Sequence, residues 1–76
     1  MTHNIHVTAE LVPDPREGGY VVYCPEFDVA SQGGDPDEAI ANLKEAVVGY
    51  IKAVGIKQAI KEYRHPIRET VEVTVK

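Results

Sequence analysis

The feature that most constrains the fold is a helix start at residues 35–38. Asp35 supplies a side-chain acceptor at the N-cap, Pro36 suits the first helical position, and Glu38 stands three residues after the cap. Apolar residues then recur at spacings of three and four, forming a stripe of Ile40, Leu43, Val47, Tyr50, Ile51 and Val54 with Ala39 and Ala46 at its margin. This spacing is typical of an amphipathic helix, and Gly55 can end it. The sequence therefore predicts one long helix that buries a single face.

Three short β-strands are predicted before this helix. Residues 5–11 alternate between apolar and polar side chains, which indicates a half-buried strand. Turn-forming residues fill positions 13–19, so the chain can reverse into a second strand at residues 20–24. Pro25 interrupts the pairing because proline has no N–H to donate, and a third strand follows at residues 28–32. Gly33 and Gly34 allow the exit into the helix.

Two further elements are expected after Gly55. Residues 56–63 keep helical spacing, which predicts a short second helix or a bent continuation before Pro66. Residues 69–76 alternate again, with valine at every second position, and predict a final strand. We expect an α+β domain of order βββαβ, in which an antiparallel meander gains a fourth strand beside the first. The helix should cross one sheet face with Leu43 and Val47 at its centre, and residues 1–76 should form a single domain.

The small size of the chain favours self-association. A chain of 76 residues forms a thin core, and its single cysteine allows no internal disulfide. A homodimer or tetramer is therefore expected. Two groups of residues are the expected contacts: Tyr20 and Val22 on one face of the second strand, and Ala41, Val48 and Gly49 on the back of the helix. Large side chains also occupy the other face of that strand, so either a second chain or solvent could cover the side of the sheet away from the helix.

Charge and hydropathy exclude several classes of protein. Twelve acidic residues against eight basic ones give a formal charge of −4, which opposes direct binding of nucleic acid. The first residues lack the charged and apolar regions of a secretory signal, and no run approaches the roughly 20 apolar residues of a membrane span. A cytoplasmic protein without a membrane segment is expected.

The sequence offers little for enzyme chemistry. Neither the three histidines nor the lone cysteine has zinc-site spacing, and no phosphate loop, nucleophile elbow or dinucleotide fingerprint is present. Cys24 lies in an apolar run and is interpreted as a buried structural thiol. Carboxylates are the remaining candidates, since a two-metal nuclease could use acids at strand ends, here Glu10, Glu26, Asp28 and Asp35. Their spacing does not require convergence, so we expect no enzyme activity, no metal and no cofactor.

The central motif resembles a known family. Gly19-Tyr20-Val21-Val22-Tyr23-Cys24-Pro25-Glu26-Phe27, followed by Ser31-Gln32-Gly33, Asp35, Glu38-Ala39, Asn42 and Glu45-Ala46, strongly resembles the HicB-like antitoxins over residues 5 to about 54. The resemblance implies a βββαβ core described as a partial RNase-H-like fold, without implying a nuclease. It also implies self-association and binding of a small HicA-type ribonuclease toxin, as in a toxin–antitoxin system. No helix-turn-helix or ribbon-helix-helix segment follows residue 76, so no separate DNA-binding domain or operator binding is expected.

The resemblance suggests where such a toxin would bind. A ribonuclease presents a basic surface to RNA, and this chain concentrates acids at Glu10, Asp14, Glu17, Glu26, Asp28, Asp35, Asp37 and Glu38. We expect the Pro25 turn to face the toxin, with Glu26 and Asp28 as charges and Tyr23 and Phe27 as apolar anchors. The alternative is a stand-alone regulatory or scaffold oligomer without a toxin partner.

Overall fold

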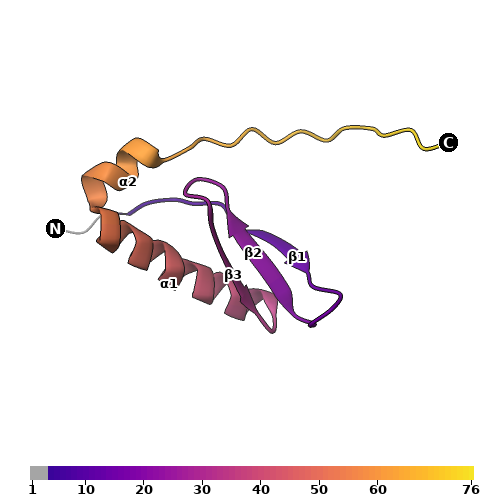
Figure 1. Ribbon diagram of the computed structural model, residues 1–76, viewed down its shortest axis with the longest axis horizontal. Coiled ribbons are helices and arrows are strands. Elements are labelled where there is room, and N and C mark those ends of the chain that lie inside the picture. The colour runs from indigo at the N-terminus through magenta and orange to yellow at the C-terminus, as the bar shows by residue number, and fades with distance from the viewer. Residues whose placement is uncertain (1–3) are drawn as a thin grey trace.

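A computed structural model of the protein describes residues 4–76 and shows an α+β fold (Figure 1). The elements in chain order are β1 Glu10–Pro13, β2 Tyr20–Cys24, β3 Val29–Gly33, α1 Pro36–Val54 and α2 Ile56–Glu62. The three strands form one antiparallel sheet in the order β1-β2-β3, and α1 lies across one face of it. The predicted class, the meander and the second helix are confirmed.

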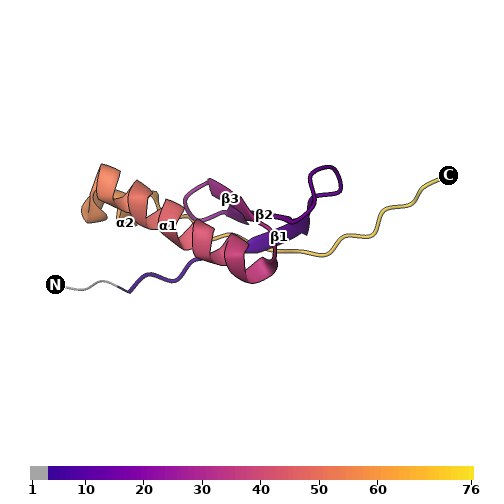
Figure 2. The ribbon, with the colours of Figure 1, turned by 90° about the horizontal axis from the view of Figure 1, so that it is seen from below.

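The register divides the sheet residues between two faces. Leu11 pairs with Val22 and Val22 with Ser31, and these side chains share the α1 face because paired residues in neighbouring strands point the same way. Val12, Val21 and Tyr23 belong to the opposite, open face, where Val12 and Val21 are exposed. Figure 2, seen from below, shows α1 in front of the sheet.

The start of α1 has the predicted capping arrangement. The Asp35 carboxylate accepts a hydrogen bond from the Glu38 backbone N–H at 2.8 Å, and the Glu38 carboxylate accepts one from the Gly34 N–H at 3.1 Å. At the other end, Gly55 has a φ of 87° and its N–H donates to the Ile51 carbonyl at 2.7 Å. Glycine adopts this backbone region without steric cost, so α1 ends where the sequence predicts.

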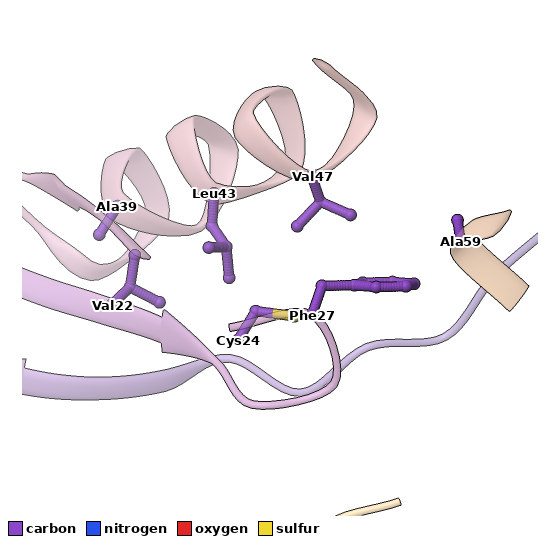
Figure 3. Close-up of a cluster of buried hydrophobic side chains, with 7 residues drawn as sticks. All are labelled: Val22, Cys24, Phe27, Ala39, Leu43, Val47 and Ala59. Atoms are coloured by element: carbon purple, nitrogen blue, oxygen red, sulfur yellow. The ribbon is translucent and has the colours of Figure 1, made fainter. Parts of the chain in front are cut away.

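The core lies between α1, β2 and the Pro25 turn (Figure 3). Its buried hydrophobic residues are Val22, Cys24, Phe27, Ala39, Leu43, Val47 and Ala59. Leu43 and Val47 are central, as expected. Ala39 was expected at the margin but is fully buried, because Gly33 lets α1 approach β3 closely: a Cβ added at Gly33 would lie 2.3 Å from the Ala39 nitrogen.

The first strand differs from its prediction. It begins at Glu10 and extends to Pro13, whereas residues 5–9 are extended but belong to no ladder. Side chains, and not a neighbouring strand, form hydrogen bonds with the backbone of this segment. The Thr8 N–H donates to Glu26, and the His6 carbonyl accepts from the Tyr63 hydroxyl at 2.6 Å. The third strand is also shifted by one residue, to Val29–Gly33.

The segment predicted as a fourth strand has no strand partner in the described chain. Residues 63–76 leave α2 as an extended arm, defined here as the C-terminal arm, that ends beyond the sheet in both views (Figures 1 and 2). Its early part is attached by a backbone hydrogen bond from Arg64 to the Glu26 carbonyl and by an ion pair of 2.9 Å between Arg68 and Glu10. Its later valines, Val71, Val73 and Val75, are 73–88% exposed.

Candidate interaction surfaces

Glu26 is buried and does not present its charge at the surface. Only 3% of the residue is exposed. Its carboxylate accepts hydrogen bonds from the Thr8 N–H at 2.8 Å, the Thr8 hydroxyl at 2.5 Å and the Cys24 thiol at 3.4 Å. Burial alone would raise the pKa of Glu26, but the hydrogen bonds from Thr8, together with those from the Glu26 backbone and the Cys24 thiol, outweigh burial and hold the pKa below its ordinary value. The expectation that Glu26 contacts a partner is therefore wrong, because it ties the N-terminal segment to the turn.

Phe27 is also an internal residue. It is 6% exposed, and its ring packs against Tyr50 at a centroid distance of 5.9 Å and edge-on against Tyr63 at 5.5 Å. Tyr63 in turn packs against His65. The proposed anchoring role of Phe27 is wrong because this aromatic cluster joins the Pro25 turn to α1 and to the end of α2.

Tyr23 and Asp28 remain at the surface of the turn. The Tyr23 hydroxyl donates to the Asp28 carboxylate at 2.9 Å, and this hydrogen bond is the main reason that the pKa of Tyr23 is raised. Asp28 has a φ of 56°, a conformation that aspartate tolerates in turns. Arginines lie close by, since Arg64 bonds to the turn and Arg68 pairs with Glu10. This end of the molecule therefore carries both signs of charge.

Five of the twelve acidic side chains gather at the opposite end of the sheet. Because Tyr20 pairs with Gly33, the β1–β2 loop and the start of α1 lie side by side. This acidic end is defined by Asp14, Glu17, Asp35, Asp37 and Glu38. Between the loop and the helix lies a hollow of about 410 Å³ whose lining includes three acids, Asp14, Glu17 and Glu38, and no basic residue. The toxin-facing charges were expected at the Pro25 turn, as Glu26 and Asp28, whereas these five acids lie at the other end of β2.

The acidic end is held in a defined shape. The Asp14 carboxylate accepts hydrogen bonds from the backbone N–H groups of Arg16 at 2.9 Å and Glu17 at 3.2 Å. Asp35 and Glu38 are fixed by the helix cap. Asn42 of α1 donates to the Gln32 carbonyl at 2.8 Å and thereby ties the helix to β3. The carboxylates of the acidic end are therefore partly preorganised.

An apolar groove runs between the C-terminal half of α1 and the N-terminal segment. It has a volume of about 700 Å³, and its apolar lining consists of Ile5, Val7, Val47, Val48, Ile51 and Ile56. Lys44 and Lys52 also line it. The sequence did not predict this groove, because residues 5–9 were expected to lie within the sheet. The only signal in the sequence was the apolar Val48 on the back of the helix, which was assigned to an oligomer contact.

The residues expected to form oligomer contacts differ in how far they are exposed. Val22 is completely buried beneath α1, so its assignment to an interface is wrong. Tyr20 is half-buried and lines the acidic hollow. Ala41, Val48 and Gly49 are exposed on α1, and Val48 borders the groove. The large residues left uncovered on β2 are Val21 and Tyr23, the set opposite to the one expected.

The acids considered for metal-dependent chemistry have other partners. Glu10 pairs with Arg68, Asp28 accepts from Tyr23, and Asp35 caps α1. Among residues 4–76, no group of three or more histidine, cysteine or acidic side chains is placed to hold a metal ion. Cys24 is buried, and burial raises the pKa of its thiol. The absence of enzyme activity stays a prediction.

No helix of the described chain has both the length and the hydropathy needed to cross a bilayer. No protein-family model, curated protein or solved structure matches this sequence significantly. The resemblance to the HicB-like antitoxins thus depends on the motif at residues 19–27 and the capped helix alone.

Proposed function

We propose that this protein is an antitoxin-like binding module that sequesters a small, basic ribonuclease of the HicA type by covering its RNA-binding surface. The observation that carries the proposal is the acidic end. There, five carboxylates lie on the β1–β2 loop and at the start of α1, and three of them, Asp14, Glu17 and Glu38, line a hollow that no basic residue lines. A surface that holds an RNA backbone must be basic, so it is complementary to this end. The function requires neither a cofactor nor direct contact between this chain and nucleic acid.

The physical role of the acids is to guide association. Long-range attraction between opposite fields raises association rates by roughly 10–1,000-fold at low salt. Preorganised carboxylates also lower the entropic cost of docking, because the loop and the helix cap already hold Asp14, Asp35 and Glu38. Inhibition follows from occupancy, since RNA cannot reach a covered surface. The proposed site of action is the cytoplasm.

A second candidate contact is the pair formed by half-buried Tyr23 and exposed Asp28 on the turn. It belongs to the open face of the sheet, where Val12 and Val21 are also exposed and could add apolar contact. Charge reversal can separate the two surfaces because they lie at opposite ends of β2.

Self-association forms part of the proposal. In the assembled protein, residues 69–76 would form the fourth strand and complete the order βββαβ. The alternation of the valines and their exposure in the single chain support this arrangement. The same observation favours the alternative function, a stand-alone regulatory or scaffold oligomer that binds no toxin.

The test is the rate at which the chain associates with its cognate toxin. Glu17→Lys combined with Asp37→Lys should slow association by at least about tenfold at low ionic strength and by much less at high salt, where charges are screened. Asp28→Lys, a single reversal at the other end, is the control and should have a smaller effect. A larger effect of Asp28→Lys would move the interface to the turn. If the wild-type chain neither bound the toxin nor blocked its RNA cleavage, the proposed function would be wrong.

A further inference from the structure

Two segments with the alternation of β-strands have no strand partner in the described chain. One is residues 5–9, directly before β1, and the other is residues 69–76 in the C-terminal arm. Both were predicted as strands because apolar and polar residues alternate, yet the sheet contains only β1, β2 and β3. Each segment therefore has backbone groups available for pairing.

Residues 5–9 can pair with another strand along their outer edge, the side that faces away from Tyr63 and Glu26. In an extended segment, the backbone groups of successive residues point to opposite sides. The His6 carbonyl and the Thr8 N–H point inward, to Tyr63 and Glu26. The groups of Ile5, Val7 and Ala9 therefore point outward, and no backbone hydrogen bond from them is found within residues 4–76. The apolar groove lies next to this edge, with Ile5 and Val7 in its wall.

The C-terminal arm has the complementary pattern. Val71, Val73 and Val75 share one side and are 73–88% exposed, while Thr70, Glu72 and Thr74 share the other. Eight extended residues span about 26 Å, enough to cross a whole sheet edge. The arm gives the chain a longest dimension of 54 Å and a radius of gyration of 14.7 Å, against about 11 Å for a compact domain of this length. A solvated row of valines in an otherwise small, folded chain indicates a missing partner surface.

We propose that residues 69–76 of one copy lie against the outer edge of residues 5–9 of a second copy, with the three valines closing the apolar groove. The exchange would be reciprocal, which gives a closed dimer with twofold symmetry. Glu69 has the same parity as the valines and would therefore lie on the groove side, where Lys44 and Lys52 supply the opposite charge. This inference deepens the self-association included in the proposed function and does not require a toxin.

The path of the arm explains why the acceptor belongs to a second copy. Arg68 pairs with Glu10, whose side chain is on the open face because Glu10 pairs with Tyr23. The groove is on the α1 side of the same segment. To reach its own groove, the arm would have to wrap around the β1 edge and reverse direction immediately after Arg68. Instead it continues away from the sheet in both views (Figures 1 and 2).

The first test is the mass of the free protein in solution by light scattering. The wild-type chain should have at least twice the 8.4 kDa mass of one chain, and Val73→Asp should return it to one chain. Thr74→Asp places the same charge on the opposite side of the arm and should preserve the dimer. Both positions are exposed in the single chain, so circular dichroism should show the fold intact in both variants. A wild-type monomer at high concentration, or equal behaviour of the two variants, would overturn the exchange.

The second test distinguishes exchange between copies from folding back within one chain. Val7→Cys and Val73→Cys chains are mixed under oxidising conditions, and a covalent product containing one chain of each type is expected. Thr74→Cys replaces Val73→Cys as the control and should give much less product. A chain carrying both Val7→Cys and Val73→Cys that closes internally at the mass of one chain would overturn the proposal. Since no toxin is present, this failure would leave toxin binding unaffected.

Discussion

Replacing Gly33 with alanine tests the closest contact between the helix and the sheet. A Cβ on Gly33 would lie 2.3 Å from the Ala39 nitrogen, 2.7 Å from the Ala39 Cα and 2.8 Å from the Glu38 carbonyl carbon. All three atoms belong to the backbone of α1, so no side chain can rotate away. The helix would have to move by about 1 Å to restore van der Waals separation. That movement would disturb the cap at Asp35 and the packing of Leu43.

The size of the effect follows from this geometry. Overpacking a core costs about 1–3 kcal/mol and more where the backbone must shift, so Gly33→Ala should cost at least about 3 kcal/mol. The whole domain has a free energy of unfolding of about 4–11 kcal/mol on a per-residue basis. With a urea m-value of about 1 kcal/mol/M, the midpoint should fall by about 3 M.

Gly49→Ala is the matched control for this experiment. Gly49 is exposed within α1, and an added Cβ would meet nothing within 4 Å beyond its chain neighbours and the adjacent helix backbone. Because alanine is a better helix former, this change should stabilise the protein by about 0.5–1 kcal/mol. Both variants must be compared at equal protein concentration, since association adds to apparent stability. If the free energy of unfolding of Gly33→Ala were within about 0.5 kcal/mol of the wild-type value, the close approach of α1 to β3 would be refuted.

Two further predictions concern the core and the buried carboxylate. Leu43→Ala should leave a cavity beneath α1 and cost about 2–5 kcal/mol in equilibrium unfolding, and an unchanged midpoint would mean that another helix face is buried. Glu26 has a lower pKa in the folded chain than in the unfolded chain. The contribution of its ionised carboxylate to the free energy of unfolding should therefore be complete at pH 7 and decline as the pH falls below about 4.3 toward the pKa of the folded chain. Urea midpoints at several pH values should therefore show Glu26→Gln to be less stable than the wild type at pH 7, with the difference narrowing in acid. A difference that stayed constant down to pH 3 would contradict the role of the ionised carboxylate.

The sequence predicted those features of the fold that depend on local patterns. The cap at Asp35, the stripe of α1 and the end at Gly55 involve residues a few positions apart, and all are confirmed. The alternation of residues 5–11 has one parity throughout, so it could not show where pairing with β2 begins. That limit is set by β2, which has only five residues.

The candidate site was harder to predict because its key contacts are distant in sequence. A glutamate after Pro25 is typical of an exposed turn, and its burial depends on Thr8, 18 positions away. Phe27 likewise depends on Tyr50 and Tyr63. The position of the acidic end could have been predicted, because in any three-stranded meander the first loop and the exit of the third strand share one end. The alternation along β2 correctly separated Tyr20 and Val22 from Val21 and Tyr23, but it did not show which of these two faces α1 covers.

The central claim, that this chain binds and silences a basic ribonuclease, is tested most directly by capture from its native cells. The wild-type chain and the variant carrying Glu17→Lys and Asp37→Lys serve as paired baits at low ionic strength. The account predicts that a small basic protein is enriched on the wild-type bait and depleted on the variant. After separation, this protein should cleave RNA, and adding back the wild-type chain should stop the cleavage. Recovery of no such protein, or of one whose cleavage of RNA the chain does not inhibit, would contradict the account.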